Sequence, residues 1–163
     1  ADPCGWVVWH AGGRKLPVWG KDGVVLRTTK MKTVAGSQSG LMGRHALARL
    51  AVDPSPKVVW KVEGPTDLMA LLGIIPPEKR DKHLVVCNAG GANENIRPEI
   101  AELFSGHRVF VLHDADRPGE AGAAKWLEAV GRVASEVRQV RLPYEIADSH
   151  GKDLREWIRE HRM

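Results

Sequence analysis

Acidic residues occur in two clusters whose composition is suited to binding a divalent cation. Glu63 and Asp67 lie four residues apart in the first cluster, and Asp114 and Asp116 lie two residues apart in the second. Carboxylate oxygens are ligands that Mg²⁺ and Mn²⁺ prefer. Several carboxylates placed close together repel one another unless a cation or basic groups compensate for their charge. The two clusters therefore predict a site for Mg²⁺ or Mn²⁺.

Alternating strand and helix patterns surround these clusters from residue 57 onward. Short apolar runs predict strands, and apolar residues at helical spacing predict the helices between them. The predicted strands are 58–62, 83–87, 108–112 and 137–142, and the predicted helices are 66–72, 96–104, 118–133 and 153–159. This alternation predicts an α/β fold with a mainly parallel four-stranded sheet and helices on both faces.

The expected sheet would bring the acidic residues to one edge, because ligand sites of open α/β sheets lie beyond the carboxyl ends of the strands. Glu63, Asn88 and Asp114 each follow a predicted strand. Asp67 lies in the first turn of the next helix and can face the same crevice. The spacing of Asp116 from Asp114 lets both carboxylates reach one ion.

Each acidic residue also has a purely structural interpretation. Glu63 could end a strand in solvent, and Asp67 could favour a helix N-terminus electrostatically. Asp114 and Asp116 could be turn and N-cap residues. Asp153, at the start of the last predicted helix, is either a helix cap or a further acid of the site.

The turn at residues 88–92 contains Asn88, Gly90 and Gly91. Backbone amides in such a turn can approach a phosphate or a metal-bound water. The alternative is a tight connection without a ligand. For His113, beside the second acidic cluster, we expect a role in packing.

The first 52 residues differ from the rest, because they are rich in Gly, Trp, Lys and Arg. Short strands are predicted at 6–9, 16–19 and 24–26, and the turn at 20–23 predicts a hairpin. A loop is expected at 33–43 and a short helix at 44–52. The Asp-Pro-Ser-Pro segment at 53–56 predicts a boundary, which gives a small basic subdomain at 1–52 and a larger domain at 53–163.

The composition sets further limits. The chain has 163 residues, 43% of them hydrophobic, and a formal net charge of +4, which permits binding to a polyanion. No apolar stretch is long enough to span a bilayer, so no membrane partner is expected. Cys4 and Cys87 have no zinc-ligand spacing, and this use of cysteine favours a reducing cytoplasm.

The acidic motifs resemble those of the Toprim domain, which primases, topoisomerases and some nucleases share. The Glu-Gly pair at Glu63, with Asp67 downstream, resembles its first motif, and the Asp114–Asp116 pair, with a following Gly119, resembles its Asp-x-Asp motif. The resemblance covers residues 57–163. It implies a Rossmann-like fold and Mg²⁺-dependent making or breaking of phosphodiester bonds, with Glu63, Asp114 and Asp116 as catalytic residues.

Residues 16–50 resemble the basic subdomain that precedes Toprim in bacterial, phage and plasmid DNA primases. By this resemblance Arg27, Lys30, Lys32 and Arg44 would line a groove for template or nucleotide, together with Asn88, Gly90 and Gly91 of the larger domain. Phosphate contacts would make the binding salt-dependent. The alternative is a solvated basic face.

The resemblance therefore implies a DNA-replication enzyme, the Mg²⁺-dependent nucleotidyltransferase core of a primase. Its partners would be a single-stranded DNA template, ribonucleoside triphosphates, and a zinc-binding module or replicative helicase on the same or another chain. The metal ligands would be drawn from Glu63, Asp67, Asp114, Asp116 and Asp153. Two alternatives stay open, a Toprim nuclease and a catalytically inactive module that binds nucleic acid.

Overall fold

A computed structural model describes residues 7–9, 14–29, 31–34, 40–53, 55–89 and 96–161. The chain divides into two compact units, Ala1–Ser39 and Gly40–Met163. This division lies 13 residues before the boundary predicted from the sequence after residue 52. The intervening residues belong with the larger unit, because they form a strand and a helix that pack on its sheet.

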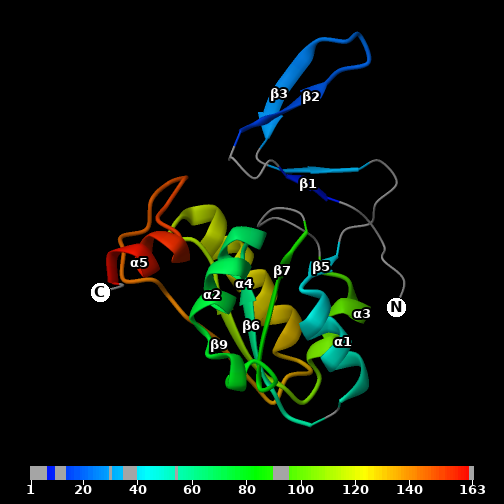
Figure 1. The fold of residues 1–163 in the computed structure, drawn as a ribbon, viewed down its shortest axis with the longest axis vertical. Coiled ribbons are helices and arrows are strands. Elements are labelled where there is room, and N and C mark those ends of the chain that lie inside the picture. The colour runs from blue at the N-terminus through cyan, green and yellow to red at the C-terminus, as the bar shows by residue number, and fades with distance from the viewer. Residues whose placement is uncertain are drawn as a thin grey trace. The chain divides into compact units, whose positions relative to one another are not determined.

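The first unit contains two small antiparallel sheets (Figure 1). Strand β1 (Val7–Trp9) pairs with β4 (Met31–Thr33), and β2 (Leu16–Trp19) pairs with β3 (Val25–Thr29). Gly23, with φ of 76°, supplies the left-handed backbone of the turn that joins β2 to β3. The predicted hairpin is confirmed.

The second unit is built on a five-stranded sheet in the order β5-β7-β6-β8-β9. Its strands are β5 (Leu41–Met42), β6 (Val58–Val62), β7 (His83–Asn88), β8 (Arg108–Leu112) and β9 (Glu136–Gln139). Its helices are α1 (Arg44–Val52), α2 (Pro65–Ile74), α3 (Pro98–Ala101), α4 (Arg117–Val130) and α5 (Leu154–His161), with the 3₁₀ turns η1 (Pro77–Lys79) and η2 (Glu102–Phe104). The α/β class and the mainly parallel sheet are confirmed.

Four of the strands run parallel, as the sequence predicts, and the fifth strand was not expected. Strand β5 pairs antiparallel with the end of β7, in the segment for which the sequence predicts a loop. Two residues are too few to show the alternation from which strands are predicted. The pairing depends instead on an open edge of β7, which only the assembled sheet provides.

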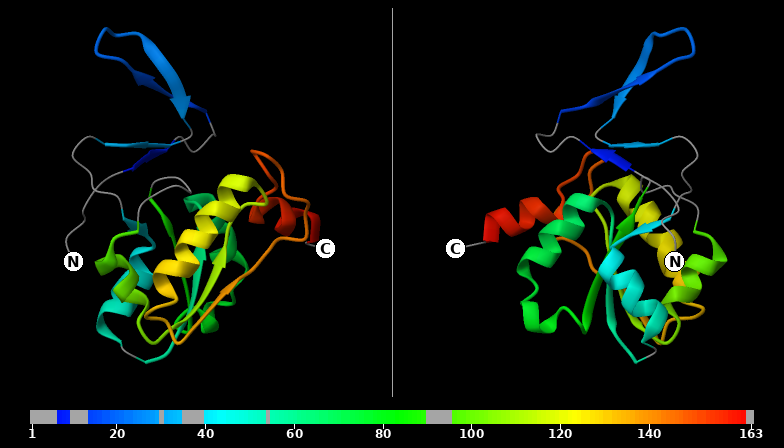
Figure 2. Two further views of the ribbon diagram at one scale, coloured as in Figure 1. Left: turned by 180° about the vertical axis from the view of Figure 1, so that it is seen from behind. Right: turned by 45° about the vertical axis from the view of Figure 1, so that its right-hand side comes forward.

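Helices cover both faces of the sheet, as the two views of Figure 2 show. Helices α1, α3 and α4 pack on one face around side chains such as Phe104 and Trp126. Helices α2 and α5 pack on the other face around residues such as Leu71 and Ile158. The central strands are buried on both faces, which explains their almost continuously apolar sequences. No helix within the described ranges is long and apolar enough to cross a membrane.

Some predicted elements are shorter than expected or are broken, and the helix predicted at 118–133 ends at Val130. The last strand ends at Gln139 instead of residue 142, because its partner β8 ends at Leu112 and the amide of Val140 makes a final bond to the Val111 carbonyl. The helix predicted at 96–104 is divided into α3 and η2. Pro98 occupies the first turn of α3, where its missing N–H has no helical partner to lose.

Replacing Gly43, between β5 and α1, tests whether the short edge strand packs as described. Its φ is 122°, and a Cβ built there would lie 2.6 Å from the Val85 carbonyl oxygen. Gly106 has a φ of 72° and no atom within 4 Å of such a Cβ, so it is a matched control. We expect Gly106→Ala to lower the free energy of unfolding by about 1–2 kcal/mol through backbone strain alone. Gly43→Ala should lower it by roughly 3 kcal/mol or more.

Urea unfolding of both variants measures the difference. Equal destabilisation by the two substitutions would show that Gly43 does not lie against β7.

Candidate functional site

The parallel register of the central strands places the first residues beyond them at one level. Val62 of β6 pairs with Cys87 of β7 and with Leu112 of β8. The two acidic clusters are therefore in direct contact: the backbone amide of Asp114 in the second cluster donates to Oε2 of Glu63 in the first at 3.2 Å. The predicted convergence of the two acidic clusters at the carboxyl edge is confirmed.

Asp114 is at the electrostatic centre of the site. Burial, followed by the negative charges of four neighbouring carboxylates, raises the pKa of its carboxyl to about 8. These neighbours, in order of decreasing effect, are Glu63, Asp67, Asp153 and Asp116. The structure therefore brings all five acids predicted as metal ligands within electrostatic reach of one another.

Asp67 is held by the first turn of α2, a helix that begins with Pro65. Its side chain is buried, and its Oδ1 atom makes no hydrogen bond. Burial, followed by the negative charge of Asp153, raises the pKa of this carboxyl to about 6, against the opposing charge of the Arg155 guanidinium. Asp67 is therefore more than a helix-end acid in solvent, because a buried carboxylate oxygen without a donor is open to a cation.

Asp116 is the N-cap of α4, one of the alternatives that the sequence left open. Its Oδ1 accepts from the amide of Gly119 at 2.8 Å, and its Oδ2 accepts from the amide of Gly151 at 3.0 Å. Each carboxylate oxygen has two acceptor positions, so both oxygens keep capacity for a further ligand. The capping role therefore does not exclude metal binding by Asp116.

The segment before α5 is joined to the Asp114–Asp116 turn by backbone bonds. The amide of Ala147 donates to the Ala115 carbonyl, and the Ala115 amide donates to the Lys152 carbonyl. Gly151 lies so close that a Cβ there would be 2.1 Å from the Ala115 oxygen. This contact brings the start of α5, and with it Asp153, to the other acids although the sequence separates them by 37 residues from Asp116.

Asp153 caps α5 in a reciprocal arrangement. Its Oδ1 accepts from the amide of Glu156 at 2.9 Å, and its own amide donates to Glu156 Oε2 at 3.2 Å, which is a capping box. Arg155 forms an ion pair with the same carboxylate. Asp153 is thus both the helix cap and a further acid of the site, the two interpretations that the sequence left open.

A buried basic residue, Lys61, was missed as a site residue. Its Nζ donates to the Val62 carbonyl at 2.7 Å, lies 3.0 Å from Nε2 of His113, and approaches the ring of Trp126. The sequence signal was a lysine inside an otherwise apolar central strand, a position where a charge is rarely buried unless it is paired.

His113 links this lysine to the acidic cluster. Its side chain is almost fully buried, its Nδ1 lies 3.2 Å from the Gly119 carbonyl, and Glu63 Oε2 is 3.9 Å away. Burial, followed by the charge of Lys61, lowers the pKa of His113 to about 3. A neutral ring that donates from Nδ1 and accepts at Nε2 fits these partners, and the position agrees with the packing role expected for His113.

The remaining predicted binding residues are spread over both units of the chain. Asn88 ends β7 and is fully buried, and Arg27 lies exposed on β3. Lys32 lies in β4 and Arg44 begins α1, but the structure does not describe their side chains. Lys30, Gly90 and Gly91 lie outside the described residues. Nucleotide or nucleic-acid contacts by these seven residues stay predictions.

The donor set of the site suits a hard cation, although the side chains are not arranged as a finished metal centre. Among the described residues, no three His, Cys, Asp or Glu side chains form a group that could hold an ion as it is. The unbonded oxygen of Asp67 and the mutual repulsion around Asp114 are the features that fit a cation. All candidate ligands are oxygens, which Mg²⁺ and Mn²⁺ accept.

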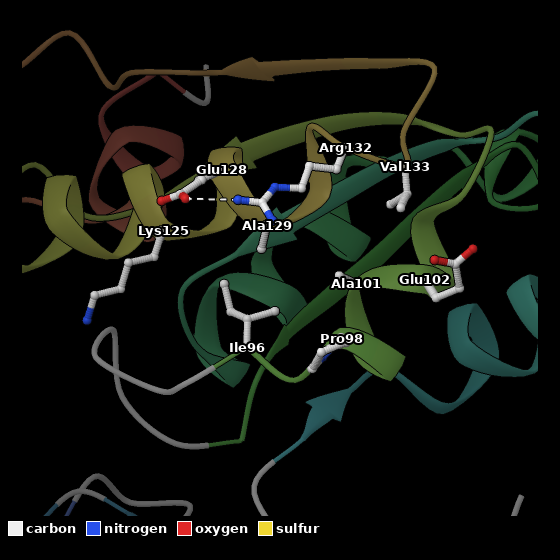
Figure 3. A pocket seen from close by; sticks show the side chains of 9 residues that line it. All are labelled: Ile96, Pro98, Ala101, Glu102, Lys125, Glu128, Ala129, Arg132 and Val133. Carbon is white, nitrogen blue, oxygen red and sulfur yellow. Dashed lines mark hydrogen bonds and ion pairs between the residues drawn. The ribbon is translucent and has the colours of Figure 1, made fainter.

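A pocket of about 410 Å³ lies elsewhere in this unit, between α3 and the second half of α4 (Figure 3). It is lined mainly by apolar side chains such as Ile96 and Val133, and an ion pair joins Glu128 to Arg132 beside it. The acidic residues described above do not line it, so it is separate from the candidate site.

Two solved structures share the fold of this chain. One is the crystal structure of the Aquifex aeolicus primase with its zinc-binding and RNA polymerase domains, with a TM-score of 0.58 and 22% sequence identity over 90% of this chain. The other is the structure of the DnaG catalytic core, with a TM-score of 0.55 and 22% identity over 90% of this chain. At this level of identity the comparisons establish a common fold.

The chain spans 36% and 48% of the length of these two structures. No protein-family model matches its sequence, and no curated protein matches it significantly.

The charge repulsion around Asp114 predicts an unusual dependence of stability on pH. With a pKa raised from 3.8 to about 8, this carboxyl binds more protons in the folded than in the unfolded state between these values. Stability without metal should therefore be lost as the pH rises through this range. At pH 8.5, we expect Asp114→Asn to be more stable than the original protein by roughly 1–3 kcal/mol, a gain that disappears near pH 4.

Urea unfolding in the presence of a chelator measures this difference at both pH values. Asp148→Asn removes an exposed carboxylate that pairs with Arg117 at the surface, and should show no such gain. A pH-independent effect of Asp114→Asn would contradict the repulsion.

Proposed function

We propose that this chain is the Mg²⁺-dependent nucleotidyltransferase core of a DNA primase, built on a Toprim domain, and that it makes short primers on single-stranded DNA from ribonucleoside triphosphates. The observation that carries the proposal is the gathering of five carboxylates, Asp114 and its four neighbours, at the carboxyl edge of the sheet. The fold shared with two primase structures supports the same reaction class.

The metal would be held by Asp67 and Asp114, with Glu63, Asp116 and Asp153 completing the set. Asp67 offers an oxygen without a hydrogen bond, and Asp114 is the carboxylate on which the other charges act most. A bound Mg²⁺ would neutralise phosphate charge and favour ionisation of the attacking hydroxyl. Mn²⁺ would substitute, because both ions accept carboxylate oxygens.

Glu63 has the properties of a proton acceptor beside such a metal site. Its carboxylate is oriented by the hydrogen bond from the Asp114 amide, and burial raises its pKa. A base with a raised pKa accepts a proton more readily near neutral pH. In a primase reaction it would take the proton of the 3′-hydroxyl that attacks the incoming triphosphate.

His113 and Lys61 are buried behind the acidic residues and would position the Glu63 carboxylate. Lys61 lowers the pKa of Glu63, in opposition to its burial and to Asp116, and the His113 ring separates the lysine from the carboxylate. These buried residues fix the position of Glu63 without access to a substrate. We therefore assign them positioning roles.

The first unit would supply contacts to template phosphates. Its hairpin carries Arg27 on β3, and Lys15 and Lys21 lie exposed beside the same strands. Exposed cations bind phosphates without reading sequence, so this contribution should weaken as salt increases. The zinc-binding domain of the Aquifex aeolicus structure supports a zinc-binding module on the same or another chain as a proposed partner. A replicative helicase is proposed from the sequence resemblance alone.

The acidic residues provide the direct test of this function. We expect Glu63→Gln and Asp114→Asn each to reduce Mg²⁺-dependent primer synthesis about 100-fold or more, because a positioned base and a metal ligand each contribute at least this much. The assay combines single-stranded DNA, labelled ribonucleotides and Mg²⁺, and separates products by length. Circular dichroism confirms that the variants remain folded.

Asp148→Asn is the control that should keep the original activity, since this exposed carboxylate pairs only with Arg117 among the described ion pairs. Retained synthesis in either acidic variant would contradict the proposed site. The same assay distinguishes the alternatives: shortening of the DNA would indicate a nuclease, and binding without growth or loss would indicate an inactive binding module.

A further inference from the structure

Arg155, on the first turn of α5, contributes a positive charge to the acidic site. Its Nε donates to Oδ2 of Asp153 at 3.0 Å, and its terminal Nη2 donates to the same oxygen. Because a carboxylate oxygen has two acceptor positions, Arg155 uses both positions on this atom. The other oxygen of Asp153 already accepts from the Glu156 amide.

The same guanidinium faces a second acid from another helix. Nε of Arg155 lies 3.9 Å from Oδ1 of Asp67, the buried oxygen that has no hydrogen bond. Asp67 is only 5% exposed, so water compensates its charge poorly. Helices α2 and α5 pack together on one face of the sheet, which keeps the arginine beside both carboxylates (Figure 1).

The position of Arg155 conflicts with metal binding by the same acids. A divalent ion coordinated by Oδ2 of Asp153 needs an acceptor position that the guanidinium now uses, and an ion on Asp67 Oδ1 would lie next to a positive charge. Two cations at such a separation repel each other strongly wherever water is partly excluded. The guanidinium side chain is half exposed, so it has room to move outward.

We propose that Arg155 is a built-in counter-cation of the acidic site, which a divalent ion must displace from Asp67 and Asp153 in order to bind. This inference rests on the metal site of the proposed function and adds how that site is regulated. In the absence of metal, Arg155 offsets part of the carboxylate repulsion. When the metal binds, the arginine gives up these contacts, so its charge lowers the affinity of the site for the ion.

An ordinary surface ion pair would behave differently. A pair between exposed charges contributes little and has no effect on a distant ligand. The contact with the buried, unbonded oxygen of Asp67 distinguishes Arg155 from other arginines of α5, such as Arg159, which is more exposed and lies 3.7 Å from Glu156. Arg159 is therefore a matched control on the same helix.

Binding of Mn²⁺ in the absence of nucleotide and DNA tests the proposal, with free Mn²⁺ followed by electron paramagnetic resonance. We expect Arg155→Gln to bind Mn²⁺ about tenfold more tightly than the original protein, because a neutral side chain no longer repels the ion. Arg155→Lys keeps the positive charge and should stay close to the original affinity, as should Arg159→Gln.

Thermal unfolding supplies a second measurement. Without metal, Arg155→Gln should melt at a lower temperature than the original protein. Saturating Mn²⁺ should raise the melting temperature of Arg155→Gln more than it raises that of the original protein. A purely structural role would predict the first change without tighter Mn²⁺ binding. Unchanged Mn²⁺ affinity in Arg155→Gln would therefore overturn the inference while leaving the metal site intact. Absence of Mn²⁺ binding by all four proteins would overturn the metal site and the inference together.

Discussion

Repulsion among carboxylates at one edge of the sheet is the constraint on which the organisation of this site depends. The parallel register of β6 and β8 brings Glu63 and Asp114 to the same level, and the adjoining helices add three more acids. In water such charges would be well screened, but burial removes much of that screening. The surrounding structure has to compensate for this charge in some way wherever the protein is folded without a cation.

Three kinds of compensation are present in the structure. Backbone amides donate to Asp116 and to Glu63, which fixes the positions of these carboxylates. Arg155 pairs with Asp153 and faces Asp67. The negative charge that these contacts do not compensate is reduced by protonation of Asp114, whose pKa lies far above that of an ordinary aspartate. This incomplete compensation of charge is the feature on which the proposed cation binding rests.

Two buried polar residues, Lys61 and His113, lie in the interior next to the acidic edge of the sheet. Lys61 lies in the middle of the sheet against Trp126, and His113 lies between it and Glu63. A buried charge is expensive unless it is hydrogen-bonded, and here the Val62 carbonyl and the histidine ring supply partners. The arrangement keeps a positive charge at a fixed distance behind the acids without exposing it to ligands.

Much of this arrangement could be predicted from the chain. Apolar runs followed by acids predicted the strands and the acidic residues at their carboxyl ends, because a buried parallel strand needs a continuous apolar sequence. For Asp153 the sequence offered a helix cap or a further acid of the site as alternatives, and for Asp116 it offered a capping role. Lys61 was missed because hydrophobic periodicity treats one polar residue in a strand as an interruption. Its partners His113, just after β8, and Trp126 of α4 lie far away in the sequence.

The sequence by itself determined which residues lie at the carboxyl ends of strands, because that depends on local patterns of apolar and acidic residues. It also determined the chemistry of the site, since carboxylates bring the same ligand oxygens to any fold. Only the tertiary structure decided that Leu41 and Met42 would add an antiparallel edge strand. The same holds for Arg155, whose approach to Asp67 depends on how α2 and α5 pack together. Residues from distant segments meet through packing, and no local pattern encodes the distance between them.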